Sequence, residues 1–236
     1  MGKVMISGVA PQMNVPIALP PIGTALNDMT WEQIRDISDA GKATDYFNVG
    51  DTKNITLDGV SYPVQIIGFN HDTLTSGGTA GITFQLVDCL NTTYQMNSSD
   101  TNSGGWTSCA MRTSVLNSIF PSLPADLQKA IKAVNKLTSA GSQSATINTT
   151  SDKLFLLSEV EIFGSTTYSK SGEGSQYAYY KAGNSKVKKV NGSEDTWWER
   201  SPSGSDSTHF CFVFSGGTAG RSEASTGRGV SFAFCV

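Results

Sequence analysis

The chain has 236 residues, of which 38% are hydrophobic and 24 are glycine, and this composition favours one loop-rich domain over a helical bundle. Its formal net charge of -3 provides no basic surface of the kind that nucleic-acid binding requires, so we expect no nucleic-acid partner. No apolar run reaches the roughly 18 residues of a membrane span, and we expect none.

The first 27 residues have the character of an extended N-terminal arm. Pro11, Pro16 and the pair Pro20 and Pro21 interrupt the apolar residues before they form a core long enough for a signal peptide. We therefore expect no signal peptide. We expect residues 1–27 to serve attachment or oligomerisation, and residues 28–236 to form the folded domain.

Two segments have the spacing of helices. Thr30 and Gln33 fit a capping box, apolar residues recur behind them at helical intervals, and Gly41 supplies a stop. Residues 109–120 repeat the same periodicity, and Pro121 ends it. These are the two main helices that the sequence predicts.

Most of the remaining apolar segments predict short strands. Residues 53–57 and 62–69 flank Asp58-Gly59, a strong hairpin signal. Residues 82–90 indicate a buried strand, and residues 153–163 indicate a buried strand that ends in a turn or short helix. Because strands and helices do not alternate, we expect an α+β fold with mostly antiparallel strands and no doubly wound sheet.

Few residues offer catalytic chemistry. The chain has two histidines: His71 in a polar loop, which we interpret as solvent-facing, and His209, which we interpret as a contact residue. Glu159 and Glu161 stand two apart on an expected strand, which puts them on one face. We interpret them as a solvated or hydrogen-bonded face, and the alternatives are a glycosidase-like pair or a calcium site.

The four cysteines, Cys89, Cys109, Cys211 and Cys235, contain no CxxC pair. A structural zinc site is therefore not indicated, and they are too few for a disulfide scaffold. We expect buried free thiols, with a contact between Cys211 and Cys235 as the exception, and neither a metal nor another cofactor.

The segment 197–236 differs from the rest of the chain. Trp197–Pro202 and Val230–Val236 look like framework, but between them Ser, Gly and Thr alternate with isolated residues of every chemical kind. This mixture is typical of a contact surface carried on strands and loops. In Phe210–Phe214 the alternation puts the phenylalanines on one side and Cys211 and Val213 on the other. Periodicity alone does not say which side faces the core.

The motifs WWERSP, FCFV and GVSFAFCV resemble the variable region of DUF6273-type proteins, which are diversified by retroelements in gut bacteria and their phages. The upstream runs TWEQIRDISDAGKATDYFNVGD, NSGGW, DKLFLLSEVEIFG and YYKAGNSKVK resemble the same group, so the likeness covers roughly residues 30–236. It implies a C-type-lectin-like fold, the broad scaffold of the phage major tropism determinant, which is related to the formylglycine-generating-enzyme scaffold.

The resemblance also implies which positions are constant and which are diversified. It implies that Cys211 and Val213 face the core and that Phe212 and Phe214 face outward. Glu223 departs from the pattern, because an Asn codon changed only at adenines cannot become a Glu codon. The constant framework implied is Trp197, Trp198, Arg200, Ser201, Pro202, Phe210, Cys211, Val213, Gly217, Ala224, Gly229, Val230, Phe232 and Phe234. The ligand-binding variable positions implied are Ser205, Asp206, Thr208, His209, Phe212, Phe214, Thr218, Gly220, Arg221, Ser222, Thr226 and Arg228.

The function implied is non-enzymatic binding of a host or target-cell surface molecule, commonly a protein. The protein would belong to a phage tail tip or to a bacterial cell surface, joined to a larger assembly through the arm and assembled as a homotrimer. One alternative is a glycan-binding module or glycan-active enzyme that uses exposed aromatics with Glu159 and Glu161. Another is a purely structural tail or pilus component.

Overall fold

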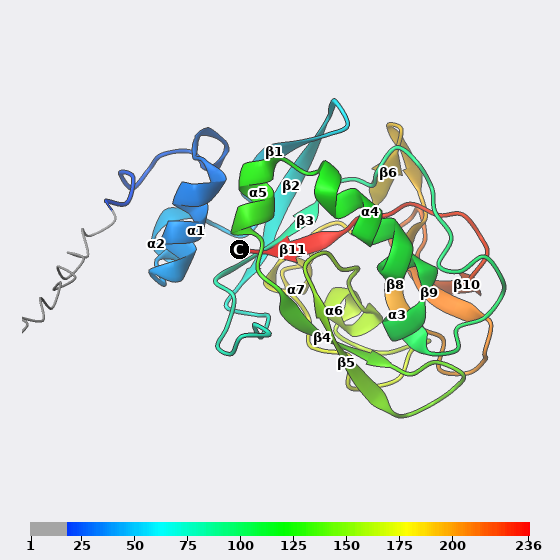
Figure 1. The fold of residues 1–236 in the computed structure, drawn as a ribbon. Helices are drawn as coiled ribbons and strands as arrows, with labels where there is room; N and C mark the ends of the chain where they lie inside the picture. The colour runs from blue at the N-terminus through cyan, green and yellow to red at the C-terminus, as the bar shows by residue number, and fades with distance from the viewer. Residues whose placement is uncertain (1–17) are drawn as a thin grey trace, which may run out of the picture.

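The computed structural model describes residues 18–236 (Figure 1). Most of the expected arm, residues 1–17, lies outside the described residues. The remainder of residues 1–27 lies against the domain, because the Tyr46 hydroxyl donates to the carbonyl of Pro20 at 2.8 Å and Leu26 is buried in a short 3-10 turn, Leu26–Asp28.

The main sheet is antiparallel and has four strands in the order β1-β2-β3-β11. The hairpin of the first two strands turns at Asp58 and Gly59, both of which have positive φ, as their sequence predicted. The fourth strand comes from the far end of the sequence and pairs with β3 in the middle of the molecule (Figure 1). The strands are β1 (Thr52–Leu57), β2 (Val60–Phe69), β3 (Ile82–Leu86) and β11 (Ala233–Cys235).

Helix α1 (Trp31–Asp39) covers this sheet and is followed by the short α2 (Ala43–Tyr46). The predicted capping box is present in both directions between Thr30 and Gln33. Trp31 packs edge-on against Phe84 of β3 and Phe234 of β11, with ring centroids 5.3 and 5.7 Å apart. One buried aromatic cluster therefore joins the first helix to the last strand.

The second predicted helix is present but irregular. The chain is extended at Cys109, with ψ of 148°, so the helix does not start there. After Cys109 the chain forms a π-helix, then a short α-helix, and then a 3-10 turn that contains Pro121. The segments are α3 (Gly105–Ser108), the π-helix Met111–Leu116, α4 (Asn117–Ile119), the 3-10 turn Phe120–Ser122 and α5 (Ala125–Ala130).

Residues 153–163 form no strand beyond a bridge between Phe155 and Ala233, but the run ends in the short helix that the sequence allowed. Ser158 accepts from the amide of Glu161 at 3.3 Å and the Glu161 carboxylate accepts from the amide of Ser158 at 3.0 Å, which starts α6, and Gly164 ends it at φ 74°. The surrounding elements are β4 (Val134–Ser139) paired with β5 (Ile147–Asp152), α6 (Glu159–Phe163), α7 (Ala178–Lys181), and β6 (Lys188–Val190) paired with β7 (Ser193–Asp195).

The segment of mixed composition forms a second antiparallel sheet in the order β10-β9-β8. Its strands are β8 (Trp197–Pro202), β9 (His209–Val213) and β10 (Ala219–Glu223). Strand β8 is buried along its whole length, whereas β10 lies at an edge and alternates in exposure. The architecture is α+β, as the sequence predicted. Across residues 18–236, no helix combines the length and apolar character needed to cross a membrane.

Candidate functional site

Strand β8 anchors the segment 197–236 to the rest of the protein. The indole N–H of Trp198 donates to the carbonyl of Tyr94 at 2.8 Å, and that of Trp197 donates to the carbonyl of Lys186 at 2.9 Å. The positions that the resemblance implied to be constant are buried, apart from the half-buried Gly217. The segment therefore consists of a packed framework with loops and one edge strand outside it.

The expected variable positions divide into two groups, because neighbouring residues of a strand point to opposite faces. In the register of the sheet, Gly220 lies opposite Phe212, while Arg221 lies opposite Cys211. We call Phe212, Phe214, Gly220, Ser222, Thr226 and Arg228 the aromatic group. We call Ser205, Asp206, Thr208, His209 and Arg221 the polar group. Thr218 is exposed in the turn between β9 and β10. The structure does not bring these positions together on one face.

Phe212 is the main departure from expectation in the aromatic group. It is 2% exposed, whereas Phe214 is 45% exposed. The guanidinium of Arg228 covers the ring of Phe212 at 3.7 Å from its centroid, and the rings of Phe214 and Trp198 pack edge-on at 4.6 and 6.3 Å. The prediction that Phe212 projects into solvent is wrong, because a neighbouring loop closes over the face on which it lies. The outward direction of Phe214 is confirmed.

Gly220 makes this packing possible. A Cβ atom at this position would lie 2.5 Å from Cε2 of Phe214 and 2.8 Å from Cζ of Phe212. Gly220 therefore supplies no contact side chain itself, and any other residue there requires both rings to move. The identity of residue 220 is coupled to that of residues 212 and 214.

Asp206 organises the polar group. Its carboxylate accepts from the Ser203 hydroxyl at 2.7 Å, from the amides of Thr208 and His209 at 3.0 and 2.8 Å, and from Arg221 at 3.1 Å. Partial burial opposes ionisation, but these hydrogen bonds, led by that of Ser203, lower the pKa of Asp206 to about 2. The 203–209 loop is thus preorganised around one carboxylate.

Arg221 also lies over the ring of Tyr168, 5.7 Å from its centroid. Its guanidinium donates to the hydroxyls of Ser203 and Ser205 as well as to Asp206. Its side chain is nevertheless 39% exposed, so part of this cation stays available to a partner.

Asn102 is a supporting residue that no sequence pattern marked. It is fully buried, and its amide donates to the carbonyls of Asp206 and His209 at 3.0 and 2.8 Å. The side-chain oxygen Oδ1 of Asn102 accepts from the backbone amide of Ser142 at 2.7 Å. A polar loop far back in the chain therefore fixes the loop of the polar group.

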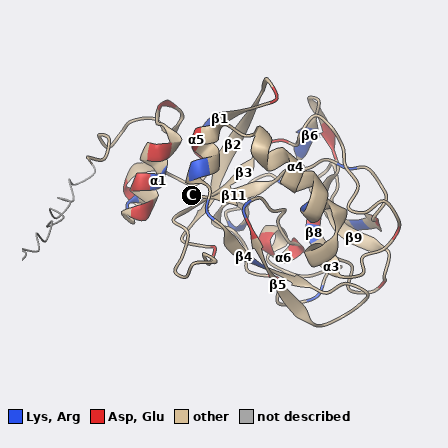
Figure 2. Ribbon diagram, viewed as in Figure 1, with Lys and Arg blue, Asp and Glu red and all other residues tan. Residues whose placement is uncertain are grey.

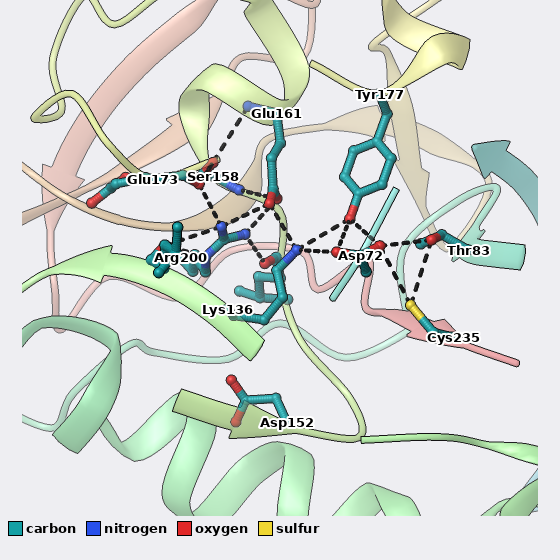
Figure 3. Close-up of polar contacts among 12 residues, drawn as sticks. Asp72, Thr83, Lys136, Asp152, Ser158, Glu161, Glu173, Tyr177, Arg200 and Cys235 are labelled. Carbon is teal, nitrogen blue, oxygen red and sulfur yellow. Dashed lines mark hydrogen bonds and ion pairs between the residues drawn. The ribbon is translucent and has the colours of Figure 1, made fainter. Parts of the chain in front are cut away.

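A buried ionic network lies behind β8 (Figure 3). Lys136 donates to Asp72 and Glu161, both at 2.7 Å, and to the hydroxyl of Tyr177 at 3.1 Å. Arg200 of β8 donates to both carboxylate oxygens of Glu161. Burial opposes ionisation of both carboxyls, but Lys136 holds the pKa of Asp72 well below its usual range, and Arg200 with Lys136 lowers that of Glu161.

Glu159 and Glu161 do not form a solvated face. They are 0% and 2% exposed and belong to α6, which carries red acidic positions in Figure 2. Glu159 accepts from the amides of Thr167, Tyr168 and Ser169 at 2.8 to 3.1 Å, which fixes the loop after the helix. A hydrogen-bonded role is confirmed, and both carboxylates bind groups of the protein itself.

His71 and the cysteines have structural surroundings. His71 is half-buried and stacks on Tyr177 with centroids 3.9 Å apart, so it faces solvent only in part, and burial lowers its pKa. The four cysteines are free and buried, without the Cys211–Cys235 bond. Burial raises the pKa of Cys89 and Cys109 to about 12. Within residues 18–236, no group of three or more His, Cys, Asp and Glu side chains is arranged to hold a metal ion.

These features define an α+β domain in which a buried framework carries exposed loops near the end of the sequence. The sequence model of a family described as a domain of unknown function, DUF6273, matches residues 80–236, more than half of the chain. The chain belongs to the DUF6273 family. No curated protein and no solved structure gives a significant match. The family match includes β3 to β11, and therefore both the aromatic and the polar group.

Proposed function

We propose that this chain is a non-enzymatic binding protein whose surface over residues 203–228 is diversified by a retroelement and binds a protein on a host or target cell. The observation that carries the proposal is the separation of roles within one segment. Buried strands β8, β9 and β11 form a fixed support, and side chains of unrelated chemistry occupy the loops and the edge strand outside it. The C-type-lectin-like fold belongs to the same proposal, because it rests on the resemblance of the sequence motifs.

The contact surface that we infer straddles the edge strand β10. Phe214 on one face and Arg221 on the other are both exposed, and Thr218 lies in the turn that joins them. An aromatic ring and an arginine are the side-chain types that most often dominate protein–protein binding energy. Phe212 and Gly220 act beneath this surface by positioning Phe214 and Arg228.

The setting of the protein is part of the proposal. We place it at a phage tail tip or on a bacterial cell surface, joined to a larger assembly through residues 1–27. A homotrimer would present several copies of the 203–228 surface, and multivalency would strengthen each weak contact.

The binding test compares fluorescently labelled wild-type protein with Phe214→Ala and Arg221→Ala on a panel of gut bacterial cells, with Lys189→Ala as a control because Lys189 is exposed on the separate β6-β7 hairpin. We expect each of the two variants to lose about tenfold or more in apparent affinity for the cells that the wild type binds, with the control unchanged. Equal binding by all four proteins would show that the surface around Phe214 and Arg221 does not bind the cells.

The diversification part has its own test in the neighbouring DNA. We expect a near-copy of the segment that encodes Trp197–Val236, differing mainly at adenines, beside a reverse-transcriptase gene. A complete source genome that holds no such copy would refute diversification and leave the binding proposal to the cell assay. The burial of Glu159 and Glu161 and their hydrogen bonds within the protein favour this proposal over the glycan-active alternative.

A further inference from the structure

A cavity of about 270 Å³ lies between the irregular helix and the end of β5, apart from the aromatic and polar groups. Arg112, Asn117 and Phe120 line it from the helical side, and Ser151 and Lys153 line it from the strand side. Its volume lies just below the roughly 300 to 1,000 Å³ of sites for drug-sized ligands, which suits a smaller ligand the size of a monosaccharide.

The cavity carries one net positive charge. Arg112 donates from Nε to Asp152 at 2.6 Å, so those two charges cancel. The Asp152 carboxylate also accepts hydrogen bonds from the indole N–H of Trp106 at 3.0 Å and from the hydroxyl of Thr150 at 2.5 Å. Within residues 18–236, Lys153 has no carboxylate within 4.0 Å, and its ammonium lies over the ring of Phe120, 4.8 Å from the centroid. A monoanion therefore matches the charge of the site.

The donors in the cavity are held in place. Arg112 is fixed by Asp152 and by bonds from Nη1 to the carbonyl of Thr107 at 3.0 Å and from Nη2 to the carbonyl of Ser151 at 3.4 Å, which leaves one N–H on each of these two nitrogens for a ligand. The amide nitrogen of Asn117 donates to the carbonyl of Thr113 at 3.0 Å, which leaves its oxygen to accept from a ligand hydroxyl. A fixed arginine fork beside a lysine is suited to a carboxylate.

The backbone gives an independent indication. Arg112 belongs to the π-helix Met111–Leu116, and π-helical turns are rare and occur frequently at functional sites. The wider turn displaces the side chains from regular α-helical spacing, and the cavity opens beside it.

We propose that this cavity binds the carboxylate of an acidic sugar, such as a uronic or sialic acid, with Arg112 and Lys153 as the anion donors and Asn117 as the acceptor for a ring hydroxyl. The site is separate from the 203–228 surface and does not depend on the function proposed above. It would give the protein a constant ligand of one chemical class beside its variable one.

The test titrates the labelled, full-length protein with glucuronate, N-acetylneuraminate, glucose and acetate, and follows the amide NMR signals of residues 111–120 and 151–154. We expect saturable shifts with at least one of the two acidic sugars, none with glucose, and affinity for acetate at least about tenfold weaker. Lys153→Glu should weaken acidic-sugar binding at least about tenfold, and Lys189→Glu, with the same charge change elsewhere, should leave it unchanged.

Asn117→Ala separates the sugar from the carboxylate, because it should weaken sugar binding and leave acetate binding as it was. Thermal melts of each variant show that it folds. Acetate binding as tight as that of both acidic sugars would overturn the sugar assignment. The absence of shifts with either acidic sugar, or equal weakening by Lys189→Glu, would overturn the site itself.

Discussion

The guanidinium carbon of Arg228 lies over the ring of Phe212, 3.7 Å from its centroid. The same side chain donates to the hydroxyl of Thr196 at 2.8 Å, and burial lowers its pKa. Two residues expected to be independent contacts are therefore one packed unit that holds the 225–228 loop on β9. This relationship changes what substitution of each aromatic residue should do.

Phe212→Ala should destabilise the protein strongly, and Phe214→Ala should not. Phe212 is 2% exposed, so its loss leaves a cavity under Arg228, and we expect the free energy of unfolding to fall by about 3 kcal/mol. For Phe214, 45% exposed, we expect a fall of less than about 1 kcal/mol. Denaturant unfolding followed by tryptophan fluorescence measures both. Similar losses in the two variants would contradict the assignment of different roles.

Gly220→Ala should be destabilising through its contact with the two rings. The added methyl group meets Phe214 at 2.5 Å, and overpacking of this kind lowers the free energy of unfolding by about 1 to 3 kcal/mol. Gly216→Ala is the matched control, since a Cβ there meets nothing within 4 Å. In a double-mutant cycle, Phe214→Ala should recover part of the loss caused by Gly220→Ala. Strict additivity of the two substitutions would argue against the coupling.

Lys136→Met should lower the free energy of unfolding by about 3 to 5 kcal/mol, because it leaves two carboxylates buried without their shared cation. The control is Lys132→Met, which removes an ion pair with the half-exposed Asp39 and should cost less than about 1 kcal/mol. Thermal and denaturant unfolding of both variants provides the comparison. If the two variants lose the same small amount, the network contributes little to stability.

Glu173→Gln should change how stability depends on pH. Burial raises the pKa of Glu173 to about 7, although hydrogen bonds from the Ser201 hydroxyl and the Ser139 amide oppose the shift. Because the folded state holds this proton more tightly than the unfolded chain, its contribution is complete below about pH 4.5 and is lost as pH rises through about 7.

The measurement is the free energy of unfolding of wild type and Glu173→Gln from pH 4 to 8. Relative to the variant, the wild type should lose on the order of 3 kcal/mol across that range. Asp72 and Glu161 have lowered pKa values, so their contribution to the free energy of unfolding is lost as pH falls. This contribution is the same in both proteins, and the difference between them cancels it. Parallel curves for the two proteins would show that Glu173 ionises alike in the folded and unfolded states.

Sequence reasoning succeeded where the signal is local. The capping box of Thr30 and Gln33 and the turn at Asp58-Gly59 act within a few residues, and both are present. The short helix that ends residues 153–163 was expected, but its capping box at Ser158 and Glu161 was not, because it lies inside an apolar run, where a buried strand and a buried helix have the same composition.

The site was predictable only in part. Alternation correctly paired Phe212 with Phe214 on one face, but it carries no information on the loop that brings Arg228 over that face. The support from Asn102 and the buried group of Asp72, Lys136 and Glu161 join residues far apart in sequence. Such contacts leave no local pattern for a single sequence to show.

The position of β11 along the chain makes folding sensitive to truncation. This strand completes the main sheet and is encoded after the loops of residues 203–228, and the Ser38 hydroxyl binds the Val236 carbonyl at 2.6 Å. A frameshift or premature stop introduced into those loops would delete the strand that closes the hydrophobic interior. We expect such truncated chains not to fold, because β3 then lacks its partner strand.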